Sequence, residues 1–161
     1  MLDAAVALIS DPPGVRRLGI ADSDLVVMRY QAYGVDIYGH AIVTTPEFAA
    51  AHGERVRRVL VAVAAAFRAT LADPARSIAV MQKRDPLVDA TMERERLDLV
   101  VREAIVTERV RRNGLGAVDP ERLRRTIATI TEAFGVPPID PTALYRADYL
   151  PPPDQRRLEA R

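Results

Sequence analysis

The chain contains no cysteine, and this absence excludes several kinds of chemistry. Without a thiol, the 161 residues can form no disulfide, no thiolate metal site and no cysteine nucleophile. Only two histidines occur, His40 and His52, so a histidine-rich metal site is also disfavoured. We therefore expect the protein to work without a metal or another cofactor.

An excess of one charge and a long apolar run are also missing. The 23 basic and 22 acidic side chains leave a net charge of +1, which gives no reason to expect nucleic acid or an anionic membrane as a partner. The longest apolar-rich stretch, Val59 to Phe67, is too short to span a bilayer. The first residues lack the basic region of a secretory signal, so the chain as written is expected to be cytoplasmic.

Short apolar runs in the first third of the chain predict strands. Ala4 to Ile9, Leu25 to Tyr30 and Ala41 to Thr45 are each rich in apolar or β-forming residues and are separated by turn signals. Runs of this kind suit strands that are buried on both faces of a sheet covered by helices. We therefore expect strands over residues 4–45.

After Thr45 the sequence predicts helices over residues 46–135. A Thr or Asp precedes a proline at five places, which is typical of a helix start because the side chain accepts a hydrogen bond from the first turn and proline lacks a free N–H. The five dipeptides are Thr45-Pro46, Asp73-Pro74, Asp85-Pro86, Asp119-Pro120 and Asp140-Pro141. Leu123, Ile127, Ile130 and Phe134 also recur at helical spacing. The proline-rich end, residues 151–161, predicts a flexible tail beyond a unit of residues 1–150.

The best candidate for a binding site is the loop from Tyr33 to Gly39, between the second and third predicted strands. Its two glycines allow a sharp turn, Tyr33 and Tyr38 offer flat faces for stacking, and Asp36 can accept hydrogen bonds from N–H groups of a ligand. A plain strand connection with packed tyrosines is the alternative interpretation.

Two further residues are candidates for contact with a ligand. Asp11 follows the first predicted strand, where ligands of open α/β sheets bind, although it could equally cap a turn before Pro12. His40 follows the glycine loop and could donate a hydrogen bond, although a lone histidine is more often a packed or surface residue. No paired base or nucleophile accompanies His40, so no catalytic residue is predicted.

The segment YGVDIYGHAIVTTPEF, from Tyr33 to Phe48, resembles the periplasmic solute-binding proteins of the thiamine-pyrimidine, alkanesulfonate and nitrate type. Similarity to that family extends from about Leu2 to Pro152 and includes the NGLG turn that ends at Gly116. The resemblance implies an α/β fold, namely the C-terminal portion of a type II periplasmic-binding-protein fold, with a few short strands followed by a mostly helical half.

The resemblance also implies a function. The chain would be the C-terminal part of the substrate-binding component of an ABC importer, not an enzyme, located in the periplasm and partnered by a permease. Its ligand would be a small organic solute, and Tyr33, Asp36, Tyr38, Asp11 and His40 would lie at the cleft. One alternative is a helical interaction protein that lost the cleft and self-associates through the face left uncovered; another is an enzyme of pyrimidine synthesis that uses His40.

Overall fold

Most of the chain after Thr45 is helical, and several of its helices begin with a polar capping residue followed by proline. In the computed structural model, which describes residues 7–158, four predicted starts are confirmed. Each capping side chain accepts a hydrogen bond of 2.7–3.2 Å from a backbone N–H of the first turn. The helices are α2 (Pro46–Ala72), α3 (Pro74–Arg84), α6 (Pro120–Phe134) and α7 (Pro141–Leu144).

The fifth predicted start, Asp85-Pro86, is wrong. The Asp85 side chain accepts a hydrogen bond from Leu87 N–H at 3.0 Å and closes a local turn instead of a helix. The next helix, α4 (Ala90–Val100), is capped by Asp89, whose Oδ1 lies 3.0 Å from Met92 N. It continues as the π-helix η3 (Val101–Ile105), and α5 (Glu108–Asn113) follows under a Thr107 cap.

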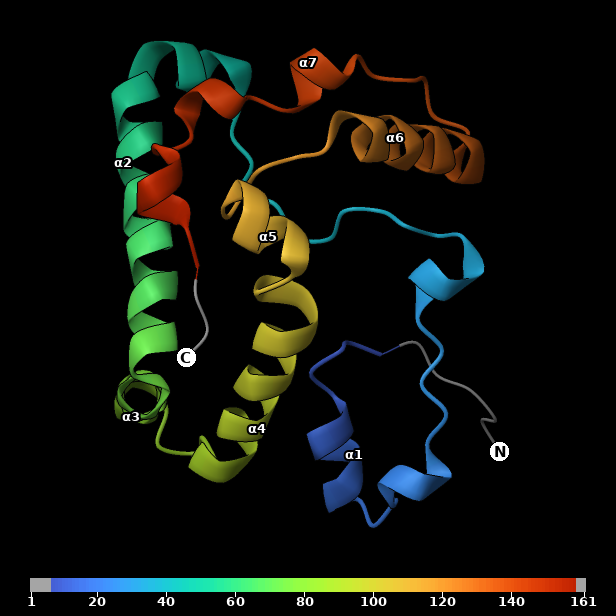
Figure 1. The fold of residues 1–161 in the computed structure, drawn as a ribbon, viewed down its shortest axis with the longest axis vertical. Helices are drawn as coiled ribbons and strands as arrows, with labels where there is room; N and C mark the ends of the chain where they lie inside the picture. Colours follow the sequence, from blue (N-terminus) through green and yellow to red (C-terminus); the bar gives the residue numbers. More distant parts are fainter. Residues whose placement is uncertain (1–6, 159–161) are drawn as a thin grey trace.

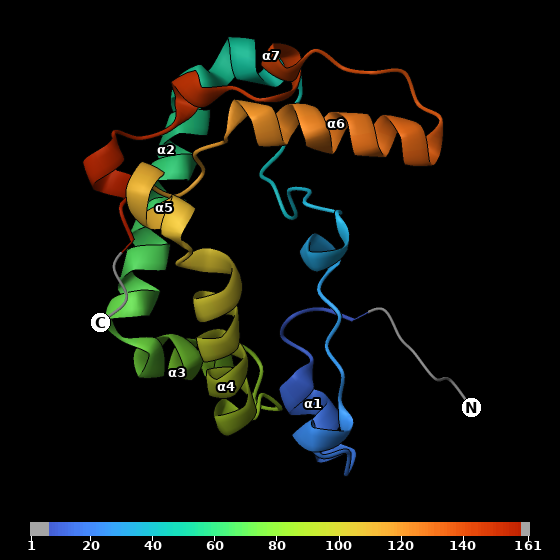
Figure 2. The same ribbon diagram turned by 45° about the vertical axis from the view of Figure 1, so that its right-hand side comes forward.

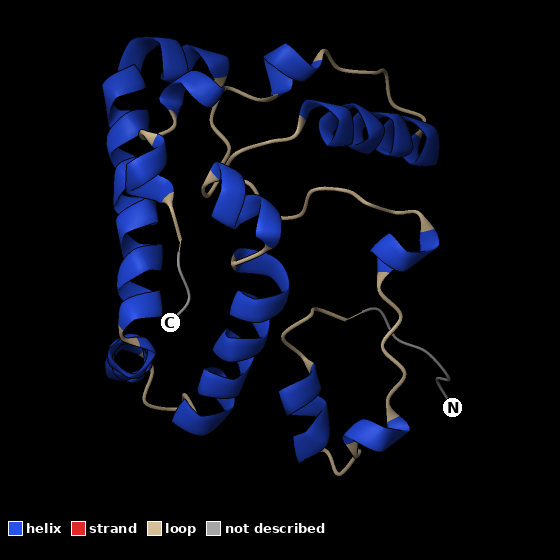
Figure 3. Cartoon of the chain, viewed as in Figure 1, coloured by secondary structure: helices blue, strands red, loops and turns tan. Residues whose placement is uncertain are grey.

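The expected strands are not found in the described residues, which form helices, turns and loops only (Figure 3). The predicted α/β class is therefore met only in its helical half. Leu25 to Tyr30 and Ala41 to Thr45 are not paired with any strand, and of the first predicted strand the described part, Ala7 to Ile9, is likewise unpaired while its start lies outside the described residues. A β-forming sequence becomes a strand only when a neighbouring strand supplies hydrogen-bond partners, and the described chain offers none.

Three short helices occupy the region where strands were expected. They are α1 (Pro12–Arg17), η1 (Asp22–Asp24) and η2 (Tyr30–Tyr33), and extended segments connect them. In Figures 1 and 2 this N-terminal part, residues 7–45, forms an open arm beside α4 and below α6. We call residues 7–45 the N-terminal arm.

The remaining helices are arranged around α2, which runs along one side of the molecule (Figure 1). α3 lies across the end of α2 and packs against α4 (Figures 1 and 2). The C-terminal segments η4 (Ala147–Tyr149) and η5 (Pro153–Arg156) pack on α2. In both views α6 extends away from this body, with α7 beside it. Among the described residues, no helix has the length and apolar content needed to cross a membrane.

Tyr149, near the C-terminal end of the chain, packs beside a kink in α2. His52 has non-helical angles (φ −133°, ψ 33°), so the helix is broken at this residue. Tyr149 donates its hydroxyl to the carbonyl of Ala49 at 3.2 Å. A Cβ at Gly53 would lie 3.2 Å from the Tyr149 ring, which explains why the smallest residue stands there.

The buried core of the described chain is small. It consists of apolar side chains from α2, α3, α6 and the segments after η3 and η5: Ala49, Ala64, Ile78, Val106, Leu123 and Leu158. Leu158 is fully buried, and the nearby Arg156 carbonyl accepts a hydrogen bond from Leu115 N–H at 2.7 Å. The end of the described chain therefore contributes to the core.

Truncation of the terminal leucine should destabilise the protein. We expect Leu158→Ala to lower the free energy of unfolding by about 2–5 kcal/mol, because it leaves a cavity at a fully buried site. Leu144→Ala is the matched control, since Leu144 is 53% exposed and its truncation leaves no cavity. Urea unfolding followed by circular dichroism measures both; equal stability of the two variants would mean that the end of the chain does not pack.

Candidate functional site

The predicted loop is attached to the first turn of α6 through one arginine. Arg122 Nη2 lies 2.8 Å from Asp36 Oδ1 and donates a hydrogen bond of 2.9 Å to the carbonyl of Ile37. The Arg122 guanidinium also lies over the ring of Tyr38, 4.2 Å from its centroid. We call these four residues, Asp36, Ile37, Tyr38 and Arg122, the Arg122 clamp.

The residues of the Arg122 clamp are partly buried. The Arg122 side chain is only 15% exposed, and residues 35–38 of the loop are half-buried. An ion pair in such surroundings is screened less by solvent than a pair on the open surface. The clamp thus fixes the middle of the loop against α6 and orients Asp36 and Tyr38.

The capping residue of α6 also holds the loop. Asp119 N–H donates a hydrogen bond of 2.9 Å to the Tyr38 hydroxyl, and Asp119 Oδ1 accepts from Arg122 N–H at 2.8 Å. The latter bond holds the pKa of Asp119 below its ordinary value. Arg109, from α5, adds a longer ion pair of 3.8 Å to Asp36.

The structure does not bring all five predicted site residues together. Asp36 and Tyr38 belong to the clamp, whereas Tyr33 and His40 lie on either side of it and are exposed. Asp11 accepts a hydrogen bond from Leu8 N–H at 2.7 Å at the start of α1, as expected of a turn residue. In the described part of the chain, no hydrogen bond or ion pair joins Asp11 to the loop.

Reasoning from the sequence missed Arg122, the central residue of this arrangement. Arg122 stands in a run of charged residues on an amphipathic helix, where arginine is expected to face water. Its partner Asp36 is far away in the sequence, so no local spacing connects the two. Only the position of the helix cap beside the NGLG turn could have indicated that this end of α6 is special.

Other arginines hold the rest of the N-terminal arm to α4 and η3. Arg17 pairs with Asp89 at 2.7 Å, Arg16 pairs with Glu95, and Arg29 pairs with Glu103. The hydrogen bond from Arg29 lowers the pKa of Glu103. Because these arginines are about half exposed, each pair contributes little to stability, and the arm is held mainly by several weak contacts.

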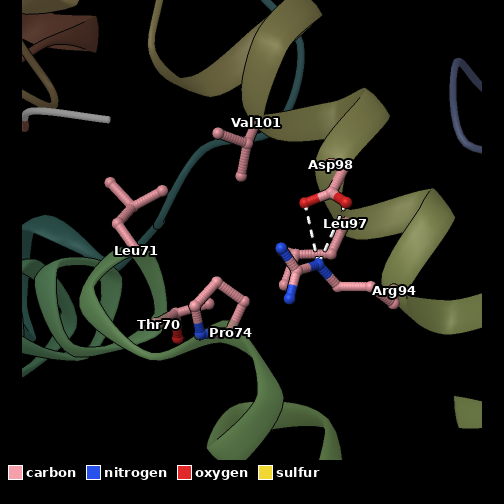
Figure 4. A pocket seen from close by; sticks show the side chains of 7 residues that line it. All are labelled: Thr70, Leu71, Pro74, Arg94, Leu97, Asp98 and Val101. Carbon is pink, nitrogen blue, oxygen red and sulfur yellow. Dashed lines mark hydrogen bonds and ion pairs between the residues drawn. The ribbon is translucent and has the colours of Figure 1, made fainter. Parts of the chain in front are cut away.

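Two of the cavities in the described part of the chain lie elsewhere. The first, of about 110 Å³, lies between α2, α3 and α4, and Figure 4 shows that the Arg94–Asp98 ion pair of 3.0 Å occupies one wall. This cavity is smaller than the roughly 300–1,000 Å³ of typical ligand pockets. The second, of about 490 Å³, is an open hollow along α6 lined in part by Ile127 and Ile139.

None of the five predicted residues lines either cavity. Within residues 7–158 there is also no group of three or more histidine, aspartate or glutamate side chains arranged to hold a metal ion. The candidate site is therefore the surface of the loop itself, with the Arg122 clamp beneath it and Tyr33 and His40 at its edges.

Comparison with known proteins identifies one family. Residues 2–77, slightly less than half of the chain, match the family described as NMT1/THI5 like. This confirms, for that part of the chain, the resemblance to solute-binding proteins of the thiamine-biosynthesis type. The match ends at Ser77, whereas we expected similarity as far as Pro152. No curated protein and no solved structure matches the chain.

Loss of the clamp should destabilise the protein more than loss of a surface arginine. We expect Arg122→Ala to lower the free energy of unfolding by about 2 kcal/mol, since it removes hydrogen bonds to a charged partner and leaves Asp36 with only Arg109. Arg124→Ala, on the same helix, removes only an exposed i,i+3 pair with Glu121 and should change stability by less than about 0.5 kcal/mol. Urea titration measures both; similar losses would contradict the clamp.

The capping carboxylates predict a loss of stability in acid. The folded chain lowers the pKa of Asp89, Asp119 and Asp140, so their stabilising effect is complete above the unfolded-state pKa and is lost as pH falls through the lower folded-state pKa. The free energy of unfolding should be steady near neutral pH and fall below about pH 4. Asp119→Asn still caps α6 but does not titrate, so its decline between about pH 5 and 2 should be shallower. Parallel curves for the two proteins would refute this.

Proposed function

Because residues 2–77 match the NMT1/THI5-like family, we propose that this chain belongs to a solute-binding protein that serves an ABC importer. The family suggests a role in solute binding or in handling a thiamine precursor. The observation that supports the proposal most directly is that all five predicted ligand residues, from Asp11 to His40, lie inside the matched range. A permease partner and a periplasmic location are parts of the same proposal.

The geometry of the loop supports ligand binding at Tyr33 and His40. The clamp fixes Asp36 and Tyr38, whereas Tyr33, which precedes them in the loop, is exposed and its ring is free to stack. Tyr33 is 64% exposed and ends η2, immediately before Gly34, which has a left-handed φ of 89°. Gly34 thus allows the chain to turn sharply between the free ring and the fixed part of the loop.

The charges around the loop favour a neutral or weakly polar ring over a free inorganic anion. Asp36 and Asp119 lie beside Arg109 and Arg122, so the formal charges of this cluster cancel. An anion would gain little net attraction from such a cluster, whereas a ring gains from stacking on tyrosine. We therefore favour a thiamine pyrimidine or flavin ligand over a sulfonate or nitrate.

Binding without chemical conversion fits the same residues. Asp36 and Tyr38 are engaged in structural contacts with Arg122 and Asp119, and His40 has no hydrogen-bond partner within the described chain. A general base needs a group that orients it and a reacting atom within reach. We accordingly propose that the protein is not an enzyme.

Thermal unfolding in the presence of small solutes tests the proposal. At about 100 times the dissociation constant, a ligand of the folded state should add about 2.7 kcal/mol to stability. The probes are the thiamine pyrimidine, riboflavin, ethanesulfonate and nitrate, and we expect one of the two ring compounds to raise the Tm. If none of the four stabilises the chain, the solute-binding proposal is wrong.

Two tyrosine variants locate the binding surface. Tyr33→Ala should weaken binding of the stabilising ring compound by roughly tenfold, because stacking contributes about 0.5–1.5 kcal/mol beyond buried area. Tyr30→Ala is the matched control, since Tyr30 is similarly exposed at the other end of η2. Isothermal titration calorimetry measures both constants, and equal losses would place the ligand elsewhere.

A further inference from the structure

The folded chain has a much larger accessible surface than a compact protein of the same mass. Its accessible area is 12,178 Å², whereas a compact monomer of 17.8 kDa exposes about 8,000 Å². The excess of about 4,000 Å² agrees with the small buried core. A standard interface buries about 800 Å² on each partner, so the excess is large enough to contain one.

The segment from Leu25 to Arg29 is the part of this surface best suited to pairing. Leu25 (φ −102°, ψ 126°) and Arg29 (φ −81°, ψ 127°) both have extended backbones. Between them Val26 is 88% exposed, Val27 is 59% exposed and Met28 is 64% exposed. The segment lies along the outer edge of the N-terminal arm in Figure 1, away from α2 and α3.

The backbone of this segment can also form hydrogen bonds with another strand. Leu25 N–H bonds to Asp22 and the Arg29 carbonyl to Ala32, but the N–H groups of the three residues between them donate no backbone hydrogen bond within the described chain. An extended, apolar and unpaired segment is a template for addition of a second strand. Another run of exposed apolar residues in the described arm, Ala41 to Val43, contains one small side chain, whereas Val26, Val27 and Met28 are all larger.

We propose that this segment pairs antiparallel with the same segment of a second copy of the chain, giving a two-fold symmetric dimer. With Val27 on the two-fold axis, Val26 of each chain faces Met28 of the other, so apolar side chains meet on the same face of the ladder. In this register Leu25 of each chain faces Arg29 of the other, whose guanidinium stays paired with Glu103 of its own chain. The pairing does not depend on the proposed ligand.

Two further features favour a second copy over a different partner. The net charge of +1 creates little repulsion between identical chains and no attraction toward a strongly charged partner. Obligate homodimers bury roughly 1,000–2,500 Å² on each chain, an amount that the excess surface can supply. An isologous interface also needs no complementary surface other than the segment itself and the arm around it.

Sedimentation equilibrium of the full chain tests the dimer. We expect a dimer with a dissociation constant in the micromolar range or tighter. Val27→Lys places two like charges face to face on the axis and removes apolar contact, so it should weaken association at least about tenfold. Leu87→Lys is the control: Leu87 is 93% exposed in the turn between α3 and α4, and its replacement should leave association unchanged.

Mixing two charge variants distinguishes direct pairing from a general loss of stability. Val27→Lys and Val27→Glu should each be mostly monomeric alone and should dimerise when combined, because the new ammonium group of one chain then faces the new carboxylate of the other across the axis. Circular dichroism should show the same helical signal for both, since Val27 contributes to no core. A monomer at about 100 µM, a dimer unaffected by Val27→Lys, or a mixture that fails to associate would each overturn the proposal.

Discussion

The attachment of Asp36 to Arg122 is the contact on which the arrangement of the candidate site depends. It joins a loop of the N-terminal arm to the first turn of α6, two parts of the chain that are far apart in sequence. Stacking of Arg122 on Tyr38 and the hydrogen bond from Asp119 reinforce the same junction. Because the other contacts of the arm with α4 and η3 are exposed ion pairs, this junction decides where the loop lies.

The same junction divides the residues of one short motif into a fixed group and an exposed group. Asp36 and Tyr38 direct their polar atoms toward α6, whereas Tyr33 and His40 remain exposed on either side. All of these residues lie inside residues 2–77, the range that matches the family model.

In the helical half, local sequence predicts most of the helix starts correctly. Thr45, Asp73, Asp119 and Asp140 cap helices where predicted, because a capping bond and a proline at the first position act within a single turn. Asp85 fails because the same kind of side chain can close a tight turn with Leu87. The strands predicted at Leu25 and Ala41 also fail, since a strand requires a neighbour that local sequence cannot supply.

By itself, the sequence determined the positions of most helix starts, the absence of thiol chemistry and the similarity of residues 2–77 to a known family. These properties follow from composition, from motifs and from contacts within a few residues. Tertiary structure alone decided that Arg122 would hold Asp36, that Tyr149 would pack against Gly53 beside the kink in α2 and that Leu158 would be buried. Each of these contacts joins distant parts of the chain, so its partner is selected by the packing of whole helices and not by any spacing along the sequence.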